Sequence, residues 1–201
     1  ILLERGHIIA QGPRRLDRAL DELLADDDFA VSGRIRALVV EMRAEWQQLD
    51  ERIDALNREF MDLVRAQEQA RRLMTIPGVG VLNATALIAA VGDASAFRRG
   101  RDLAAWLGLV PRQFTTGGKP RLLGISKRGN RYLRTLLIHG ARAALPPLAR
   151  SQTLLGAWLR NLLDRRHRNT VVVALANKLA SIAWVTLRRE APFEADRAAA
   201  A

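Results

Sequence analysis

Apolar residues in the first third of the chain recur with alternating spacings of four and three. They are Ile35, Val39, Met42, Trp46, Leu49, Ile53, Leu56, Phe60 and Leu63. Such a repeat, with charged residues at the other positions, predicts a coiled-coil helix. Since no Gly or Pro lies between Arg34 and Arg72, we expect one helix of about 40 residues, too long to bury against one small domain. We therefore predict a coiled-coil arm over residues 31–72 that pairs with a second copy of the chain. Pairing with a shorter helix of the same chain is the alternative.

Shorter helical segments flank this arm. Pro13 suits a first helical turn, and a short helix is predicted from the spacing of Leu16, Leu20, Leu23 and Leu24. Residues 1–30 are thus expected to form a linker and a short helix, with Asp26–Asp28 as polar linker residues that cap the next helix. After the arm, the pattern of Arg71–Asp93 predicts a helix, a tight Pro-Gly turn and a second apolar helix. This order is typical of a helix–hairpin–helix motif.

The remaining sequence predicts more helices and one irregular segment. Asp102–Leu109 reads as a short helix that carries Trp106 into the core, and residues 110–124, with three glycines and two prolines, predict a loop or small hairpin. Further helices are expected from Asn130 to Pro146 and Pro147, around Leu154–Leu163, and over Thr170–Leu187. The expected fold class is therefore all-α, with a helical domain over residues 73–190 and a disordered tail over residues 191–201.

Charge is distributed unevenly along the chain. Residues 1–74 carry 12 basic and 15 acidic groups, whereas residues 98–134 carry ten basic groups against Asp102 alone. Residues 135–201 carry ten basic and four acidic groups. A solvated surface usually mixes both signs, so basic charge concentrated in this way indicates contact with a phosphate backbone.

The amino-acid composition excludes several kinds of site and of protein. The chain has no cysteine, which removes disulfides and thiolate metal sites and agrees with a reducing, cytoplasmic setting. His7, His139 and His167 show no ligand spacing, so no metal site is expected in this chain. The apolar segment Thr170–Val185 is shorter than the roughly 20 residues that span a bilayer, and we interpret it as a buried helix. The chain starts without Met or a signal-peptide pattern, so we expect it to be a part of a longer protein.

Glycines and cations supply the candidate binding residues. Gly78 and Gly80 permit close backbone approach and leave the amides of the next helix open to a phosphate oxygen. The pair Gly117–Gly118 could form an anion-binding loop beside the cations. The predicted DNA-binding residues are Gly78, Gly80, Arg112, Gly117, Gly118, Lys119, Arg121, Lys127, Arg128, Arg131 and Arg134. Phe114 and Tyr132 are too few aromatics for a single-strand stacking surface, which favours duplex DNA or structured RNA.

Hydroxyl groups in the basic segment are candidate nucleophiles. Thr115, Thr116 and Ser126 lie among cations that could stabilise the charge of a phosphodiester transition state. These hydroxyls could also have only structural roles. Thr-Thr-Gly-Gly is a common turn sequence, and Ser126 could cap the following helix.

An ordered set of motifs identifies a family resemblance. The chain contains IPGVG, then FRRGRDLAAWLGLVPRQ, then TTGGK, then GISKRGNRYLR and finally LIHGAR. In this order they resemble the C-terminal half of bridge-RNA-guided insertion-sequence transposases, the IS-one-ten / IS-eleven-eleven family. The similarity covers about Arg71 to Leu148, and the preceding coiled-coil arm also fits.

The resemblance implies a protein of three parts, and we expect this chain to contain only the second and the third. It implies an N-terminal RNase H-like domain whose acidic residues bind a divalent metal such as Mg²⁺, a coiled-coil connector, and a helical domain whose serine becomes covalently joined to DNA. It also implies homo-oligomers that hold DNA and a structured guide RNA. The expected function is thus DNA transposition, with strand cleavage and exchange by this part of the protein and no cofactor bound within it.

One departure affects the expected nucleophile. The family's serine lies in a Ser-Gly or Ser-Thr-Gly-Gly turn after GLVP, whereas this chain has Thr115 and Thr116 there. Either threonine is the first candidate by position, and Ser126 is the reserve. Two other hypotheses remain open: a non-catalytic module that binds nucleic acid and dimerises, and a purely structural coiled-coil adaptor.

Overall fold

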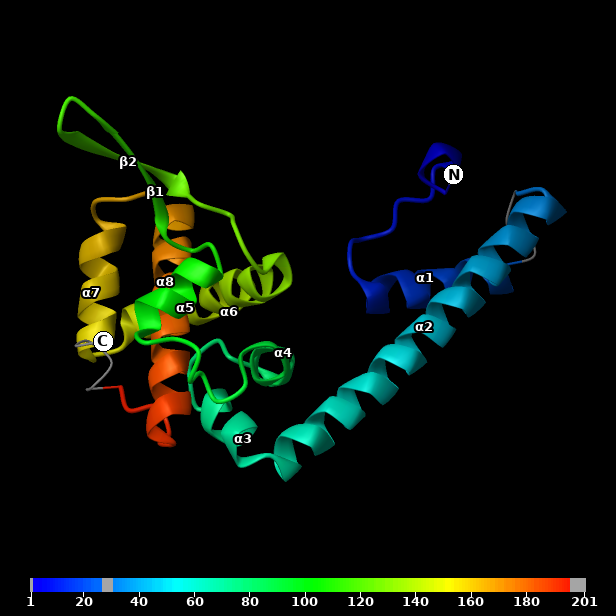
Figure 1. Cartoon of the computed structure of the whole chain (residues 1–201). Coiled ribbons are helices and arrows are strands. Elements are labelled where there is room, and N and C mark those ends of the chain that lie inside the picture. Colours follow the sequence, from blue (N-terminus) through cyan, green and yellow to red (C-terminus); the bar gives the residue numbers. More distant parts are fainter. Residues whose placement is uncertain (1, 27–30, 196–201) are drawn as a thin grey trace. The chain divides into compact units, whose positions relative to one another are not determined.

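The computed structural model describes residues 2–26 and 31–195, with the side chain of Arg5 left aside (Figure 1). Those residues form eight α-helices, a short 3-10 helix and one two-stranded sheet. The predicted class is confirmed, since helices dominate and the sheet is a single hairpin. The chain divides into two compact units, Ile1–Leu56 and Asn57–Ala201, and each is described by itself.

The first unit holds a 3-10 helix (Leu3–Arg5), α1 (Pro13–Ala25) and the N-terminal part of α2 (Gly33–Ala66). Pro13 occupies the first turn of α1, as predicted. The Arg43 guanidinium of α2 lies 2.8 Å from Asp17 and 2.6 Å from Asp21 of α1. These hydrogen bonds, with that to Asp21 the larger cause, raise the pKa of Arg43. Pairing within the chain is therefore real at this end of α2, where Leu20 is also buried.

Further along α2, the apolar stripe lacks cover. Leu49 and Ile53 are each 52% exposed and Leu56 is 44% exposed, although all three occupy the predicted heptad positions. Apolar side chains repeated along one helix face normally pack against another element. Association with a second copy of the chain stays a prediction, and the structure leaves this stripe free for it within the described residues.

The prediction of a single helix from Arg34 to Arg72 is wrong. Helix α2 ends at Ala66, Gln67 is extended with φ −108° and ψ 115°, and α3 (Glu68–Met74) begins immediately after it. No Gly or Pro marks this break. The change of direction buries Ala70 and Leu73 completely in the second unit, so tertiary packing overrides a continuous helical pattern.

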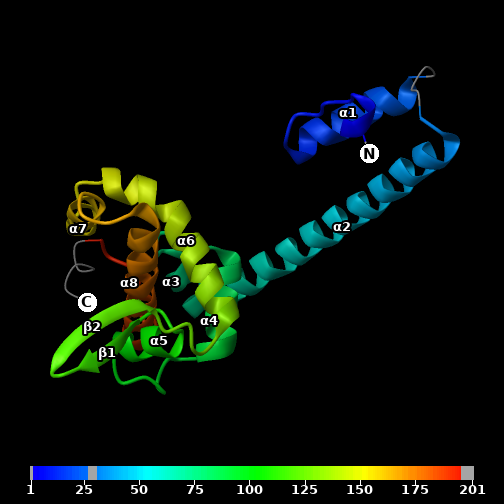
Figure 2. The same ribbon diagram turned by 90° about the horizontal axis from the view of Figure 1, so that it is seen from above.

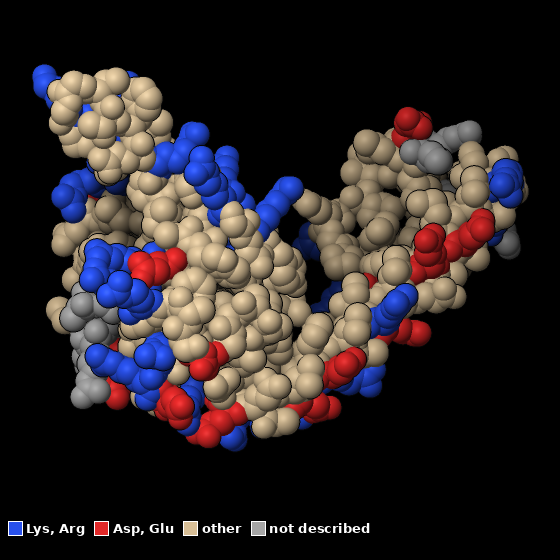
Figure 3. Space-filling model, in the orientation of Figure 1, with Lys and Arg blue, Asp and Glu red and all other residues tan. Residues whose placement is uncertain are grey.

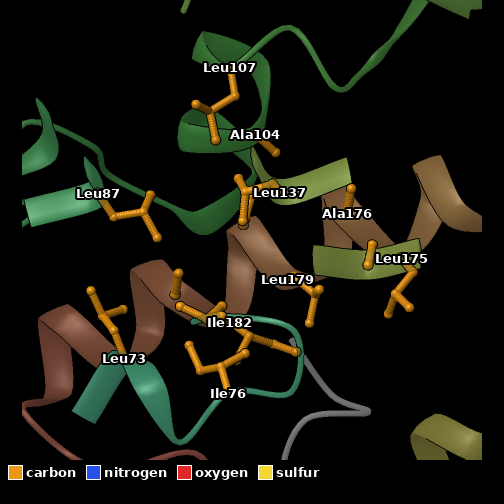
Figure 4. Close-up of a cluster of buried hydrophobic side chains, with 14 of the residues drawn as sticks. Leu73, Ile76, Leu87, Ala104, Leu107, Leu137, Leu175, Ala176, Leu179 and Ile182 are labelled. Atoms are coloured by element: carbon orange, nitrogen blue, oxygen red, sulfur yellow. The ribbon is translucent and has the colours of Figure 1, made fainter. Parts of the chain in front are cut away.

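The second unit packs its helices around α8 (Arg168–Arg189). Helices α3, α5 (Gly100–Trp106), α6 (Arg131–Arg150) and α7 (Leu154–Leu163) all contact α8, while α4 (Val81–Val91) packs on α3 and α6. Figure 4 shows how side chains from these helices meet, with Leu137 of α6 and Leu179 and Ile182 of α8 in one cluster. By length and composition α8 could also cross a membrane. Ten of its side chains are buried in the core, which confirms the interpretation as a core helix.

Two details of the helical predictions are wrong. Pro146 and Pro147 lie inside α6 instead of ending it. Each proline removes a backbone hydrogen bond, but Ala144 and Leu145 are buried and Leu148 packs on the core, which favours one more helical turn. Trp106 is 38% exposed and meets Phe97 edge-on at 5.6 Å, because the buried face of the short α5 carries Leu103 and Ala104 instead.

The expected disordered tail is also wrong for residues 191–195. Phe193 packs against the core, and its backbone N–H donates to the Thr75 hydroxyl at 2.8 Å. The rest of that prediction, residues 196–201, lies outside the described residues, as do residues 27–30 of the predicted linker.

A hairpin stands on the second unit. Strand β1 (Pro111–Thr116) pairs antiparallel with β2 (Lys119–Ile125), so the segment predicted as a loop or hairpin forms a hairpin (Figures 1 and 2). Gly117 and Gly118 join the strands with φ of 56° and 75°. Two successive positive φ angles suit a tight hairpin turn and are costly for residues other than glycine.

The root of the hairpin is clamped by backbone contact. The backbone at Gly108, after α5, touches the backbone at Arg128, and Gly129 touches that of Trp106; a Cβ on either glycine would come within 2.0 Å of a carbonyl oxygen. Lys127 N–H donates to Gly108 O at 3.1 Å and Ser126 N–H to Val110 O at 2.8 Å. Only glycine allows segments to approach so closely.

The side chain of Arg134 also holds the root of the hairpin together. Its side chain is only 9% exposed, and Nη1 donates to Leu107 O at 2.9 Å and to Arg128 O at 3.3 Å. One guanidinium thus joins the end of α5 to the loop before α6. The charged group thus points into the protein and binds carbonyl oxygens, which gives Arg134 a structural role here, and its DNA-binding role stays a prediction.

The turn before α4 contains another close contact. Gly78 has φ 82°, and a Cβ placed on it would lie 2.4 Å from Gly140 O of α6. Gly80 precedes α4 with φ −90°, and nothing lies within 4 Å of the position that a Cβ would occupy there. Helix α3, this turn and α4 follow the order that the sequence predicted, whereas a DNA-binding role for the two glycines stays a prediction.

We predict opposite outcomes for serine at these two glycines. Gly78→Ser forces a side chain into the α6 backbone at a positive φ and should lower the free energy of unfolding by about 2–4 kcal/mol. Gly80→Ser enters open space at a helix N-cap and should change it by no more than about 0.5 kcal/mol. Urea unfolding followed by circular dichroism measures both, and equal losses would refute the contact.

A second prediction concerns Arg134. Arg134→Met keeps most of the side-chain length but leaves two carbonyls without their charged donor, and should cost about 2–3 kcal/mol of unfolding free energy. Arg131→Met, at an exposed position in the same helical turn, should cost about 0.5 kcal/mol or less. The same urea titration compares them; a harmless Arg134→Met would show that its hydrogen bonds do not hold the root.

Candidate nucleic-acid interface

The hairpin is exposed on both faces. Every residue from Pro111 to Gly124 is exposed, and only Ile125 at the root is half-buried. Phe114 is 58% exposed and Leu122 68% exposed, far more than such side chains usually are in a stable fold. An uncovered two-stranded ribbon is marginally stable by itself. The exposed apolar and basic side chains on this ribbon therefore indicate a surface that binds another molecule.

The strand register separates two chemically different faces. Phe114 pairs with Arg121 and Thr116 with Lys119, so these four side chains share one face. Gln113 pairs with Leu122 and Thr115 with Pro120 on the other face. Gln113 Nε2 donates to Thr115 Oγ1 at 3.2 Å, which agrees with that assignment. One face is thus cationic and aromatic, and the other is uncharged.

Cations continue from the hairpin to the helical body. Arg112, Lys119 and Arg121 are exposed on the strands, and Lys127, Arg128 and Arg131 are exposed between β2 and the first turn of α6. Figure 3 shows blue side chains at the hairpin and along the adjoining surface of this unit. Lys127 has φ 57°, an unusual value for a residue with a side chain. Of the predicted cations, only Arg134 is withdrawn from this surface.

The structure places the three candidate hydroxyls at two separate points. Thr115 and Thr116 lie beside the Gly117–Gly118 turn, at the tip, with their side chains on opposite faces. Ser126 follows β2 at the root and is half-buried. About seven extended residues, roughly 20 Å, separate it from the tip. A site at the tip and a site at Ser126 are therefore alternatives within one chain.

Ser126 does not cap the following helix. The side chain of Asn130 occupies that position, and its Oδ1 accepts from Leu133 N–H at 3.0 Å. Asparagine just before a helix is a common N-cap, so this signal was present in the sequence and was missed. The alternating pattern between Pro111 and Ile125 likewise could have shown which side chains share a face.

No metal site is formed by what the structure describes. Within residues 2–26 and 31–195, no three His, Asp or Glu side chains lie close enough together to hold a metal ion. The hairpin itself carries exposed hydroxyl, guanidinium and ammonium groups, which suit an anionic phosphodiester.

Comparison with known proteins agrees with this chemistry. Residues 70–153, which include α4, α5, the hairpin and α6, match the Transposase IS116/IS110/IS902 family. The chain is 46% identical over 191 residues to a probable family 20 transposase of Pseudomonas aeruginosa, covering 94% of this chain and 56% of that protein. It is 42% identical over 193 residues to the transposase for insertion sequence element IS1111A of Coxiella burnetii, covering 96% and 53%.

A third relative has the same partial coverage. The transposase for insertion sequence element IS1328 of Yersinia enterocolitica is 42% identical over 156 residues, 78% of this chain and 47% of that protein. The chain thus spans about half the length of the curated relatives it matches. The exposed cationic hairpin lies inside the matched segment, and the chain is related, along nearly all of its length, to transposases of the IS116/IS110/IS902 family.

Proposed function

We propose that the second unit is the DNA strand-cleaving and strand-joining part of a transposase. The hairpin carries the proposal: an exposed ribbon with Lys119, Arg121 and Phe114 on one face and a hydroxyl among them. A two-stranded ribbon fits a duplex groove. Its cations would neutralise backbone phosphates, and the uncharged face would turn towards another strand or protein part.

Thr116 is the nucleophile that this geometry favours. It shares its face with Lys119 and Arg121, whereas Thr115 shares the uncharged face with Gln113 and Pro120. In the proposed step the Thr116 oxygen attacks the phosphorus, a phosphothreonine ester forms, and a deoxyribose oxygen leaves. The hydroxyl loses its proton to solvent and the leaving oxygen gains one. Lys119 and Arg121 stabilise the charge that builds up on the phosphoryl oxygens.

The proposal also requires a metal ion, a further domain and an RNA that this chain does not supply. A divalent metal such as Mg²⁺ would be held by the acidic RNase H-like domain that the resemblance implies, and a structured guide RNA would select the DNA. The relatives' names support action on insertion-sequence DNA. The proposal places the protein in the bacterial cytoplasm, where that DNA lies.

We expect the nucleophile to be found by trapping the covalent protein–DNA adduct. The full-length protein, with RNA and Mg²⁺, is incubated with labelled target DNA and analysed on a denaturing gel. Thr116→Val, which preserves shape and removes the hydroxyl, should abolish the adduct, whereas Thr116→Ser should retain it. Thr115→Val and Ser126→Ala are the matched controls and should retain at least about half, since neither hydroxyl reacts in this proposal.

The other outcomes are equally decisive. Loss of the adduct in Thr115→Val alone would move the nucleophile to the other face of the ribbon. Loss in Ser126→Ala alone would move it to the root. Retention in all three variants would refute nucleophilic catalysis by the hairpin.

A second candidate function is a non-catalytic module that binds nucleic acid and dimerises. The half-exposed stripe of Leu49, Ile53 and Leu56 favours the dimerisation part. This candidate is compatible with the cation-rich hairpin but not with a covalent adduct, so the trapping experiment separates the two. The third hypothesis is a purely structural adaptor. Binding that does not change with salt concentration would favour it over the other two.

The exposed stripe predicts self-association of the chain. Leu49→Glu with Leu56→Glu places two carboxylates on the apolar stripe and should shift sedimentation equilibrium from dimer to monomer, with at least a hundredfold weaker association. Gln48→Glu with Ala55→Glu adds the same charge away from the stripe and should leave association within about threefold. A monomeric parent protein at high concentration would contradict the predicted pairing.

A further inference from the structure

A second group of cations lies at the turn between α7 and α8. Arg165, Arg166 and Arg168 are exposed there beside the exposed His167, and Asp164 is the acidic residue of this short segment. The group follows the segment that matches the transposase family, which ends at residue 153. It is therefore not explained by the hairpin or by the matched motifs.

The turn is ordered by its own hydrogen bonds. Arg165 Nε donates to Asn161 O at 2.9 Å, which ties the turn to the last residues of α7. His167 precedes α8, and its Nδ1 accepts from Asn169 N–H at 3.2 Å. The remaining guanidinium groups of Arg166 and Arg168 are thus presented from a fixed backbone. A loose, solvated loop would not hold two cations in a constant position.

The electrostatic setting of this group is unfavourable in the isolated protein. The N-terminal end of a helix carries partial positive charge, so cations are disfavoured there. The first turn of α8 contains no acidic residue. Within residues 2–26 and 31–195, no carboxylate forms an ion pair with Arg165, Arg166 or Arg168. Charges that repel one another at a helix N-terminus are stabilised when an anion binds between them.

The opposite end of α8 provides an internal contrast. Arg188 and Arg189 occupy its last turn, where the helix dipole favours cations. Arg188 also lies close enough to Asp93 to help lower the pKa of that carboxyl group, after hydrogen bonds from Ser95. The arginines near the two ends of α8 therefore differ in environment: Arg188 and Arg189 are compensated within the protein, whereas Arg166 and Arg168 are not.

Figures 1 and 2 show where the cationic turn lies in the second unit. In Figure 1 the α7–α8 turn lies at the end of the unit that carries the hairpin, and in Figure 2 the turn and the hairpin lie apart. The two cation groups are thus separate points on one unit. A rigid polyanion long enough to reach both would be held at two places.

We propose that the α7–α8 turn is a second DNA contact, at which Arg166 and Arg168 bind backbone phosphates of the duplex that the hairpin engages. This inference rests on the proposed function and adds a binding surface to it. The turn has no Phe, Tyr or Trp between Asp164 and Asn169, and the imidazole of His167 accepts a hydrogen bond from Asn169 N–H, which argues against a stacking surface for single-stranded bases. Contact is with the sugar-phosphate backbone, so it supplies affinity and orientation rather than sequence preference.

The test measures salt-dependent binding of the chain to a labelled 30-base-pair duplex by fluorescence anisotropy. Arg166→Gln with Arg168→Gln removes two phosphate contacts and should weaken binding about tenfold at 100 mM salt. It should also make the slope of log K against log salt shallower by about 1.8. Arg188→Gln with Arg189→Gln makes the same change on the same helix and should alter affinity less than twofold. Arg165 is left intact because it ties the turn to α7.

Further arms separate this proposal from the proposed function. Lys119→Gln with Arg121→Gln, at the hairpin, should also reduce the slope. Failure of the parent chain to bind duplex would overturn the proposed function itself. Normal duplex binding by Arg166→Gln with Arg168→Gln, while the hairpin variant is weakened, would overturn only the second contact. An effect confined to a folded RNA hairpin would overturn the assignment to DNA.

Thermal unfolding checks that these variants fold. Removing cations from the N-terminal end of α8 relieves repulsion, so the melting temperature of Arg166→Gln with Arg168→Gln should stay equal to that of the parent or rise. A lower melting temperature together with lost binding would assign a structural role to these residues and contradict the proposal.

Discussion

The hydrogen bonds of Arg134 hold together the part of the molecule on which the exposed hairpin depends. An isolated two-stranded ribbon is marginally stable, and this one buries almost nothing between Pro111 and Gly124. Its position must therefore be set at the root. There Gly108 and Gly129 bring two backbone segments together, and the Arg134 guanidinium binds a carbonyl of each. A cation that the sequence assigns to DNA thus positions the cations that remain at the surface.

Many elements of the fold could be predicted from short sequence patterns, because residues close together in the sequence determine them. Pro13 begins α1, Gly117 and Gly118 form a hairpin turn, and the apolar segment around Leu179 forms a buried helix. The break at Gln67 and the prolines inside α6 could not be predicted in this way. In both places a segment gains burial against helices that are distant in sequence, and that gain exceeds the local preference.

The candidate site was predictable in composition but not in geometry. Counting Arg and Lys finds a basic segment, but it cannot show that Arg134 is buried while Arg131 is exposed. The same limit applies to Thr115 and Thr116, which are adjacent in sequence and lie on opposite faces of the ribbon. Only the register of the strands decides which hydroxyl shares a face with Lys119 and Arg121. The α7–α8 turn was missed because its cations follow the motifs instead of accompanying them.

Helix α8 connects the core of the second unit to its charged surface. Its middle supplies buried side chains such as Leu175 and Leu179, which fix the helix against α5 and α6. The same helix directs Arg168 outward at its N-terminal end, and α5 and α6 carry the two sides of the hairpin root. The two cation groups are therefore attached to one packed set of helices. Close packing resists small displacements, so the spacing between the groups is set by the core, and a rigid duplex is the kind of polyanion for which a fixed spacing matters.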